Sequence, residues 1–173
     1  ASLGHDRIAG LAGVARAMFA AGFRPGEIVH NTFSYHLTPG GAMAEGGARA
    51  LGCPVIPAGT GQTELQLRVI NDLRPTAYVG TPSFLVVLLD KAREMGFDTS
   101  SLCKALVSGE ALPPGLRDRL EAEFGIQAYQ LYGTADLGLI AYESLAPDGS
   151  VCEGMVLDEG IIVELVHPGT GDP

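Results

Sequence analysis

The sequence has no run of basic residues and no long uninterrupted apolar segment. Its formal net charge is −9, so nucleic acid and anionic membrane surfaces are poor candidate partners. The apolar stretch from Ile8 to Ala21 is broken by Arg16 and two glycines, which makes it too short and too polar to span a membrane. These absences argue against a nucleic-acid-binding protein and against a membrane-spanning one.

Cysteine is scarce, and no C-x-x-C pair is present. The three cysteines, Cys53, Cys103 and Cys152, lie about 50 residues apart, so neither a disulfide framework nor a zinc ribbon is indicated. We interpret them as reduced core thiols in a cytoplasmic protein.

Several enzyme classes lack their signature. There is no Gly-x-Ser-x-Gly elbow, no Cys/His set has metal-ligand spacing and Ser108 has no evident base, so a hydrolase finds little support. The first strand–turn–helix lacks Gly-x-Gly-x-x-Gly, which disfavours an NAD-dependent oxidoreductase. The Gly59-Thr60-Gly61 segment could receive an anion at a helix N-terminus, but it lacks the Gly-Lys-Ser/Thr ending of a P-loop.

What the chain does have is a regular alternation of short apolar runs and helical patterns. Its 173 residues, with 24 glycines and 11 prolines, suit one loop-rich domain or part of a larger one. We expect strands near residues 28–33, 53–56, 77–79, 104–107 and 126–131, each preceded or followed by a helix. This order predicts an α/β fold, a mainly parallel sheet with helices on both faces.

Local signals place the helices between these strands. The first helix is expected over residues 5–21, and the second over residues 41–51. Thr63 is expected to cap the third, with Leu65, Val69 and Leu73 on its apolar face. Residues 81–82 (Thr-Pro) open the fourth, which Gly96 closes, and two prolines at 113–114 open the fifth.

The pattern changes after Gly138. Residues 139–142, 155–157 and 161–166 read as strands separated by Asp-Gly and Glu-Gly turns, which predicts a small antiparallel appendage. We therefore divide the chain into an α/β core, residues 1–138, and an antiparallel segment, residues 139–173. The sequence ends in a turn and starts in a helix without a preceding strand, so we expect an excised piece of a longer enzyme.

Two stretches carry the candidate chemistry, residues 108–112 (Ser-Gly-Glu-Ala-Leu) and 130–138 (Gln-Leu-Tyr-Gly-Thr-Ala-Asp-Leu-Gly). Each follows an apolar run that ends in glycine, so each is expected at the carboxyl end of a buried strand that opens into a loop, where ligands bind in open α/β sheets. An aromatic face and a carboxylate within five residues can hold a nucleobase beside a magnesium-bound phosphate. The combination indicates nucleotide chemistry.

Each candidate has a plainer alternative. Tyr132 could stack on adenine or pack at a strand end, and Asp136 could hold Mg²⁺ or serve as a surface carboxylate. Thr134 could donate to a phosphate or bond its own turn. Glu110 could line the crevice or prepare the N-terminus of the next helix. His36 could face a substrate carboxylate or thiol, or be a partly exposed histidine without a catalytic partner.

Taken together, these residues resemble phenylacetate-CoA ligases, within the superfamily of adenylate-forming acyl-CoA ligases, peptide-synthetase adenylation domains and luciferases. The resemblance covers almost the whole chain. It rests on residues 22–27, the Tyr35 loop with Gly40 and Gly41, and residues 51–57, 62–64, 73–76, 81–83, 108–111 and 132–133.

The resemblance implies a two-step reaction. ATP and a carboxylic acid give an acyl-adenylate and pyrophosphate, and the thiol of CoA then displaces AMP. By position, Tyr132 and Gly133 would contact adenine, and Gly109, Glu110 and Ala111 would border the adenine and acyl pocket. Thr134 would contact phosphate, and Asp136 would stand where the family places a magnesium-binding glutamate. Tyr35, His36, Gly40 and Gly41 would line the acyl side.

Two departures from the family pattern stand beside these expectations. Ala135 occupies the position where a Thr or Ser usually precedes the acidic residue, and Asp136 is one methylene shorter than glutamate. The family's phosphate loop would precede Ala1, and its ribose-binding aspartate and lysine-bearing domain would follow Pro173. We expect this piece to be inactive alone, and a homodimeric parent acting on an aryl or medium-length acid. The alternative is a non-catalytic nucleotide-binding module.

Overall fold

The computed structural model describes residues 2–171, with side chains from Leu11 onward. The helices are α1 (Ser2–Ala20), α2 (Gly40–Leu51), α3 (Thr63–Leu73), α4 (Pro82–Met95) and α5 (Pro114–Phe124). The strands are β1 (Val29–Asn31), β2 (Val55–Pro57), β3 (Ala77–Gly80), β4 (Lys104–Val107), β5 (Gln127–Thr134), β6 (Gly138–Tyr142) and β7 (Val156–Leu157). The side chain of Ile8, where the apolar stretch of the first expected helix begins, lies outside the described residues.

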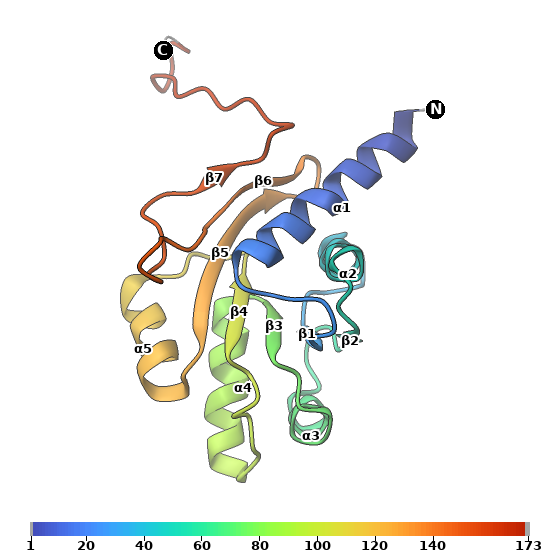
Figure 1. The fold of residues 1–173 in the computed structure, drawn as a ribbon, viewed down its shortest axis with the longest axis vertical. Helices are drawn as coiled ribbons and strands as arrows, with labels where there is room; N and C mark the ends of the chain where they lie inside the picture. The colour runs from blue at the N-terminus through green and yellow to red at the C-terminus, as the bar shows by residue number, and fades with distance from the viewer. Residues whose placement is uncertain (1, 172–173) are drawn as a thin grey trace.

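One sheet runs through the molecule in the order β2-β1-β3-β4-β5-β6-β7 (Figure 1). The strands from β2 to β5 are parallel, and β6 and β7 join antiparallel. Because β1 lies between β2 and β3, the order in which strands are added reverses its direction at β1. The helices that connect the parallel strands therefore lie on both faces of the sheet. The α/β fold with a mainly parallel sheet is therefore confirmed.

Alternating side chains of the central strands build two separate cores, one on each face of the sheet. On one face, Val79, Leu106 and Tyr129 pack with buried residues of α1 and α2. On the other, Tyr78 and Val107 pack with buried residues of α3, α4 and α5. Helices on both faces are thus required to cover a sheet that is apolar on both sides.

The predicted helix ends are confirmed in α4 and corrected in α3. Thr81 caps α4 with its hydroxyl accepting a hydrogen bond from the Phe84 amide at 3.4 Å, and Gly96 closes the helix in the left-handed conformation. In α3, however, the capping position belongs to Gln62 at φ 49°, and Thr63 is the first helical residue. A left-handed backbone at Gln62 turns the chain into the helix without a side-chain cap.

The apolar face predicted for α3 is wrong. Leu65 and Leu73 are 58% and 54% exposed, whereas Gln66, Leu67 and Ile70 are buried. The buried amide of Gln66 explains the rotation, because it donates to the carbonyls of Gly59 and Gly61 at 3.0 and 2.7 Å. These hydrogen bonds attach α3 to the loop that precedes it. The attachment places the Gln66 side of the helix toward the protein interior.

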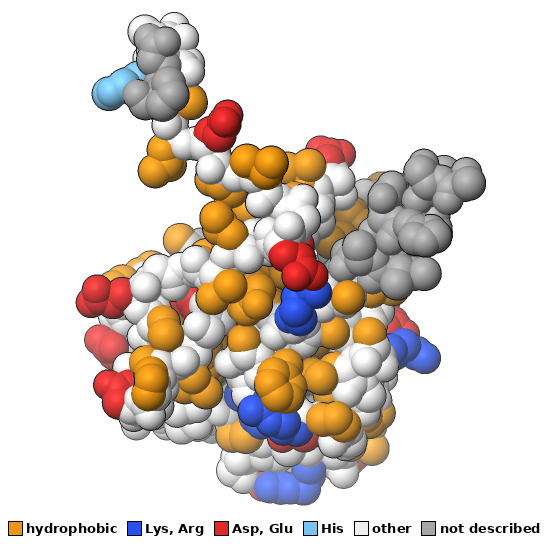
Figure 2. All heavy atoms as spheres, turned by 45° about the horizontal axis from the view of Figure 1, so that its top comes forward, with side chains coloured by type: hydrophobic (Ala, Val, Ile, Leu, Met, Phe, Trp, Pro, Cys, Tyr) orange, Lys and Arg blue, Asp and Glu red, His pale blue; other side chains and the backbone are white. Residues whose placement is uncertain are grey.

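The antiparallel appendage is confirmed for β6 and β7, but the strand predicted over residues 161–166 is wrong. Ile162 and Leu165 are 92% and 89% exposed, and the segment projects from the body of the molecule with apolar side chains along it (Figure 2). A strand needs a neighbour for its backbone groups. No described segment pairs with these residues.

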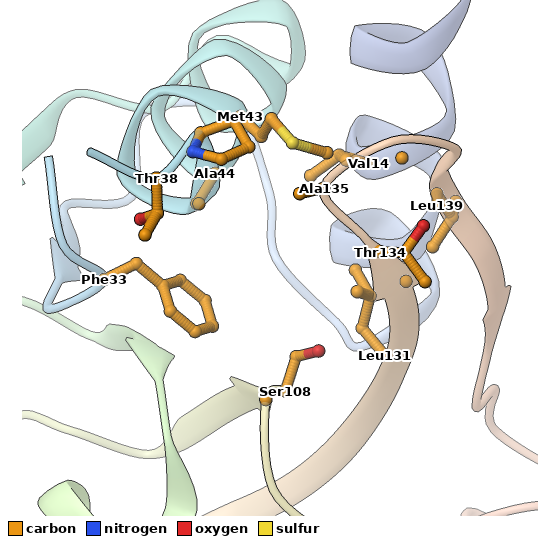
Figure 3. Close-up of a pocket in the computed structure, with 15 residues that line it drawn as sticks. Val14, Phe33, Thr38, Met43, Ala44, Ser108, Leu131, Thr134, Ala135 and Leu139 are labelled. Carbon is orange, nitrogen blue, oxygen red and sulfur yellow. The ribbon is translucent and has the colours of Figure 1, made fainter. Parts of the chain in front are cut away.

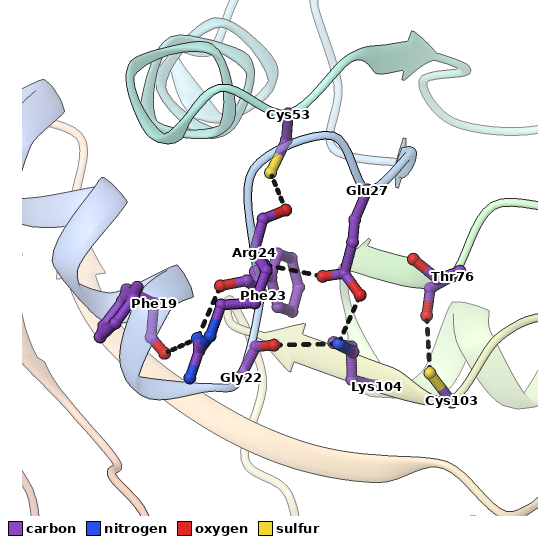
Figure 4. A network of polar contacts seen from close by, with 9 residues as sticks. All are labelled: Phe19, Gly22, Phe23, Arg24, Glu27, Cys53, Thr76, Cys103 and Lys104. Carbon is purple, nitrogen blue, oxygen red and sulfur yellow. Dashed lines mark hydrogen bonds and ion pairs between the residues drawn. The ribbon is translucent and has the colours of Figure 1, made fainter.

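A polar network fastens the connection between α1 and β1 to the amino end of β4 (Figure 4). The Lys104 ammonium donates to the Gly22 carbonyl at 2.9 Å and to the Glu27 carboxylate at 2.8 Å. The same carboxylate accepts from the Arg24 amide at 2.7 Å. The Lys104 ammonium thus contacts both ends of the short loop between α1 and β1. These contacts fix the path of the chain from the helix to the sheet.

All three cysteines are free thiols, and the prediction that they are core residues holds for one. Cys53 is buried, and burial raises the pKa of its thiol. Cys103 is exposed and Cys152 is half-buried. In residues 2–171, no helix combines the length and the apolar character that crossing a membrane requires.

Candidate active site

The candidate residues gather at the carboxyl ends of the parallel strands. The loops after Asn31 of β1, Gly80 of β3 and Val107 of β4 reach the same edge of the sheet as the end of β5. This is the edge at which open α/β sheets bind ligands. Two cavities lie there.

The first, which we call the apolar cavity, has a volume of about 240 Å³. Met43 of α2 lies across it from Ser108, and Phe33 lies across it from Leu131 (Figure 3). Its remaining walls come from α1, α2 and the β5–β6 hairpin, with Val14, Ala44, Ala135 and Leu139. Apart from the hydroxyls of Thr38, Ser108 and Thr134, the side chains are apolar, so the cavity suits an apolar group.

The second, which we call the Tyr132 pocket, has a volume of about 400 Å³. It brings together all five residues expected beside adenine, namely Gly109, Glu110, Ala111, Tyr132 and Gly133. Gln130 and Met155 also line it. The two cavities share Ser108, Gly109, Leu131 and Gly133, so groups bound in each would meet at a common wall.

The sequence predicted that Tyr132 follows its strand in a loop. In the structure it lies within β5. The strand continues to Thr134 and pairs with β6, with a register shift between Tyr132 and Gly133. A Cβ on Gly133 would lie 2.6 Å from the Gly138 carbonyl oxygen, so a glycine is required there. The Tyr132 side chain is 56% exposed and available to a ligand.

Thr134 and Asp136 flank the tip of the β5–β6 hairpin. The Thr134 hydroxyl accepts a hydrogen bond from the Leu137 amide at 3.1 Å, which leaves its hydrogen free to be donated. Asp136 is exposed in the turn. The described residues contain no group of three or more metal-ligating side chains, but Mg²⁺ bound mainly through substrate phosphates needs one or two carboxylates. A single carboxylate at Asp136 fits such an ion.

The residues expected on the acyl side separate into two groups. Gly40 lines the apolar cavity, whereas Tyr35, His36 and Gly41 are not among its lining residues. The Tyr35 hydroxyl and the Gly41 carbonyl both accept from the buried amide of Asn31, at 2.8 and 2.9 Å. His36 is exposed. These contacts make Tyr35 and Gly41 anchors of the loop behind the cavity wall.

The environment of Tyr35 also shifts its ionisation. Burial raises the pKa of its hydroxyl to about 12, with a further contribution from the Glu45 carboxylate. The hydroxyl therefore stays protonated at neutral pH and serves as a hydrogen-bonding group.

Sequence reasoning missed most of the apolar cavity. Val14 comes from α1 and Met43 from α2, and both carry the spacing of ordinary core residues. Phe33 and Leu131 follow or end apolar runs near the predicted strand ends, and that position is the one signal by which they could have been found.

Glu110 lines the Tyr132 pocket but directs its carboxylate to a helix. One oxygen accepts from the Ser83 hydroxyl at 2.9 Å, and the other is 3.4 Å from the Ser83 amide. The helix is α4, which precedes Glu110 in the chain, and not the following helix that the sequence suggested. An acidic group is favourable there because the first amides of a helix lack partners.

Gln130 joins the opposite wall of this pocket to a buried ion pair. Its side-chain oxygen accepts from the Leu112 amide at 3.0 Å, and its side-chain nitrogen donates to Glu143 at 3.1 Å. Glu143 in turn accepts two hydrogen bonds from Arg117 at 2.8 and 2.9 Å. Paired in this way, the largely buried Glu143 charge is satisfied.

Comparisons with known proteins show what this chain is similar to. Residues 7–173 match the profile of the family described as AMP-binding enzyme. A phenylacetate-coenzyme A ligase of Aromatoleum evansii is 35% identical over 164 residues, which are 92% of this chain and 36% of that protein. The phenylacetate-coenzyme A ligase of Thermus thermophilus is 33% identical over 165 residues, with the same coverage.

A solved structure shows the same fold. The 2-hydroxyisobutyryl-CoA ligase in complex with 2-HIB-AMP and CoA, in its thioesterification state, superposes with a TM-score of 0.85 at 27% identity. The alignment covers 96% of this chain and 36% of that one. The chain thus spans about a third of the length of the curated relatives it matches.

Proposed function

Because the chain belongs to the AMP-binding enzyme family, we propose that the protein carrying it is an AMP-forming carboxylate–CoA ligase similar to phenylacetate-CoA ligases. In the first step a carboxylate oxygen attacks the α-phosphorus of ATP and pyrophosphate leaves. In the second step the sulfur of CoA attacks the acyl carbon and AMP leaves. This chain supplies the binding surface for the acid and the nucleotide.

The observation that carries the proposal is the common wall of the two cavities. An acid whose apolar part occupies the apolar cavity, and a nucleotide whose base occupies the Tyr132 pocket, would meet beside Ser108, Gly109, Leu131 and Gly133. Holding two reactants in contact lowers the barrier because their translational freedom is lost on binding rather than during reaction. A common wall is what joining an acid to a nucleotide requires.

The character of the apolar cavity supports an aryl or compact medium-length acid. Val14, Phe33 and Leu131 offer no hydrogen-bonding side-chain atoms, so a polar substituent that lay against them would be desolvated without compensation. Its volume of about 240 Å³ suits a small substrate. Related proteins bearing the name phenylacetate-coenzyme A ligase are consistent with this class.

In this reading, Tyr132 offers its ring to adenine, and the backbone of Gly109 and Ala111 borders the base. Thr134 donates its free hydroxyl hydrogen to a phosphate oxygen. Asp136 contributes an oxygen ligand to Mg²⁺, and the bound ion would supply neutralisation of phosphate charge. Tyr35, His36 and Gly41 act on the acyl side through the loop that supports Gly40.

Other expectations stay predictions. They are the division of the chain at residue 138, a homodimeric parent, a cytoplasmic location and the inactivity of this chain alone.

The test is pyrophosphate release by the complete protein with ATP, Mg²⁺ and a panel of aryl and aliphatic acids, each with and without CoA. We expect acid-dependent release, highest for an unsubstituted aryl acid, with acyl-CoA formed when CoA is present. A folded protein that binds ATP but releases no pyrophosphate with any acid would instead be a non-catalytic nucleotide-binding module.

A variant pair assigns the nucleotide site within the same assay. Tyr132→Ala should raise the KM for ATP by about tenfold, because base–aromatic stacking is worth about 1–3 kcal/mol. Phe19→Ala is the matched control, since Phe19 is similarly exposed, at 53% against 56%, but lies at the opposite edge of the sheet beside Arg24. Equal effects of the two substitutions would contradict the assignment.

A further inference from the structure

The loop of residues 108–112 forms one wall of the Tyr132 pocket and is attached to the fold on two sides. On one side the Glu110 carboxylate accepts from the Ser83 hydroxyl at 2.9 Å. On the other, the Leu112 amide donates to the Gln130 side chain at 3.0 Å. Gly109 and Ala111, the neighbours of Glu110 on either side, line the pocket. Their position is therefore set by the hydrogen bonds of Glu110 and Gln130 to other parts of the fold.

The two attachments of the loop differ in how firmly the partner side chain is held. Gln130 is held by Glu143, which is paired with Arg117 and largely buried. Ser83 and Glu110 are exposed, so their hydrogen bond competes with water. The Ser83 side is therefore the adjustable one, and it can be altered without disturbing a buried charge.

Ser83 is itself held in a defined place. It occupies the first turn of α4, after Thr81 and Pro82. The buried Tyr78 hydroxyl donates to the Thr81 carbonyl at 3.0 Å, which fixes the start of the helix against the core. Ser83 lines neither the apolar cavity nor the Tyr132 pocket, so it does not reach a bound base.

We propose that Ser83 is a positioning residue for nucleotide binding, which acts through the Glu110 carboxylate to hold Gly109 and Ala111 against the base. This inference rests on the proposed function for the identity of the ligand. It assigns the Glu110 side chain to the shape of the loop and not to contact with nucleotide. The acid, bound in the apolar cavity, should be affected much less.

The experiment compares Ser83→Ala, Ser83→Thr and Ser100→Ala in the complete protein. Ser100 is the matched control, because it is also an exposed serine whose hydroxyl makes a side-chain hydrogen bond, to Arg74 at 3.2 Å, and it lies in the loop before β4. AMP affinity is measured by calorimetry, thermal stability by melting, and KM separately for ATP and for the acid.

We expect Ser83→Ala to weaken AMP binding by about threefold to tenfold, the range of one lost hydrogen bond, with the melting temperature and the KM for the acid nearly unchanged. Ser83→Thr keeps a hydroxyl and should restore affinity. Ser100→Ala should bind AMP as the wild type does. Unchanged AMP affinity in Ser83→Ala, or a parallel loss of acid binding and thermal stability, would overturn the proposal.

A double-mutant cycle tests the route through Glu110. If Ser83 acts through this carboxylate, Ser83→Ala adds nothing to Glu110→Ala, whereas independent effects would add. Additive losses would overturn the route.

The outcomes separate this inference from the proposed function. A wild type that binds AMP without turnover, and whose affinity falls in Ser83→Ala, supports the positioning role and rejects the ligase. A wild type that turns over an acid, with unchanged AMP affinity in Ser83→Ala, rejects the positioning role alone. A wild type that binds no nucleotide rejects both.

Discussion

At the scale of single residues, Gly80 shows how closely the strand ends are packed beneath the site. The Thr32 hydroxyl donates to the Tyr78 hydroxyl at 2.8 Å, and both groups are buried. A Cβ on Gly80 would collide with the hydroxyl oxygens of both residues. The absence of a side chain at Gly80 is therefore a condition for the hydroxyl pair and for the start of α4 that it supports.

Gly80→Ala should destabilise the protein by about 1–3 kcal/mol, the usual cost of overpacking. Gly115→Ala is its control, because a Cβ on Gly115 meets nothing within 4 Å and alanine favours a helix by about 0.5–1 kcal/mol. Denaturant unfolding of the complete protein measures both. Equal stability of the two variants would show that the strand ends can relax around a methyl group.

At the scale of elements, α1 and α2 approach closely through two adjacent glycines of α2. A Cβ on Gly46 would collide with a terminal methyl carbon of the flexible Leu11 side chain. A Cβ on Gly47 would instead meet Val14, whose Cβ would lie 2.7 Å away and whose backbone carbonyl carbon 3.2 Å away. The helices therefore depend unequally on these two positions.

This asymmetry predicts opposite results from neighbouring substitutions. Gly46→Ala should be close to neutral, because the gain in helix propensity of about 0.5–1 kcal/mol offsets a small displacement of Leu11. Gly47→Ala should cost about 1–3 kcal/mol, because the β-branched Val14 is rigid. Free energies of unfolding would distinguish them, and a stabilising Gly47→Ala would refute the close approach.

The elements themselves were largely predictable from local signals. Thr81 specifies a helix start through its side-chain hydroxyl, whereas Gly96 and the prolines at 113–114 specify helix ends through their own backbone geometry. The orientation of α3 was not, because its buried face follows Gln66, a polar residue whose partners come from a distant strand and a loop. The periodicity of the sequence indicates where hydrophobic residues recur, and it does not indicate that a polar amide is buried.

The candidate site residues, like the elements, were predictable only where a local signal in the sequence marked them. Candidate residues at strand ends, such as Gly109 and Tyr132, could be proposed from the sequence because the topology of a parallel sheet brings strand ends together. Val14 was not, because it reaches the apolar cavity from a helix more than 90 residues earlier than Ser108 in the chain. Which helix covers which strand depends on tertiary packing.

At the scale of the whole molecule, the folding equilibrium depends on a neutral histidine. His30 is fully buried in β1, and burial lowers the pKa of its ring. Because the Gln66 amide nitrogen donates to loop carbonyls, its oxygen faces the His30 Nε2 at 2.8 Å, and that nitrogen carries the proton. Nδ1 has no partner among the described groups, so protonation would bury an uncompensated charge.

The consequence is a loss of stability in acid. Unfolded His30 binds a proton near its ordinary pKa of about 6.5, and the folded form resists it, so the free energy of unfolding falls as pH drops below that value. The slope should reach about 1.4 kcal/mol per pH unit more than in His30→Gln. Urea titrations of both proteins between about pH 7.5 and 5.5 measure it. Parallel slopes would show that the unfolded and folded rings titrate alike.

The ion pair between Arg16 of α1 and Asp158, at 2.7 Å, bears on the order in which a nascent chain acquires its structure. Val14 of the same helix shares the apolar cavity with Leu139, so α1, which packs on the early helix α2, receives its last two partners from residues far along the chain. Until residues 139–158 have left the ribosome, the inner face of α1 has an incomplete partner surface. The parallel strands have mostly short-range connections, whereas this contact spans most of the chain and closes late. Ribosome-bound chains should therefore contain an ordered sheet before they contain a finished cavity.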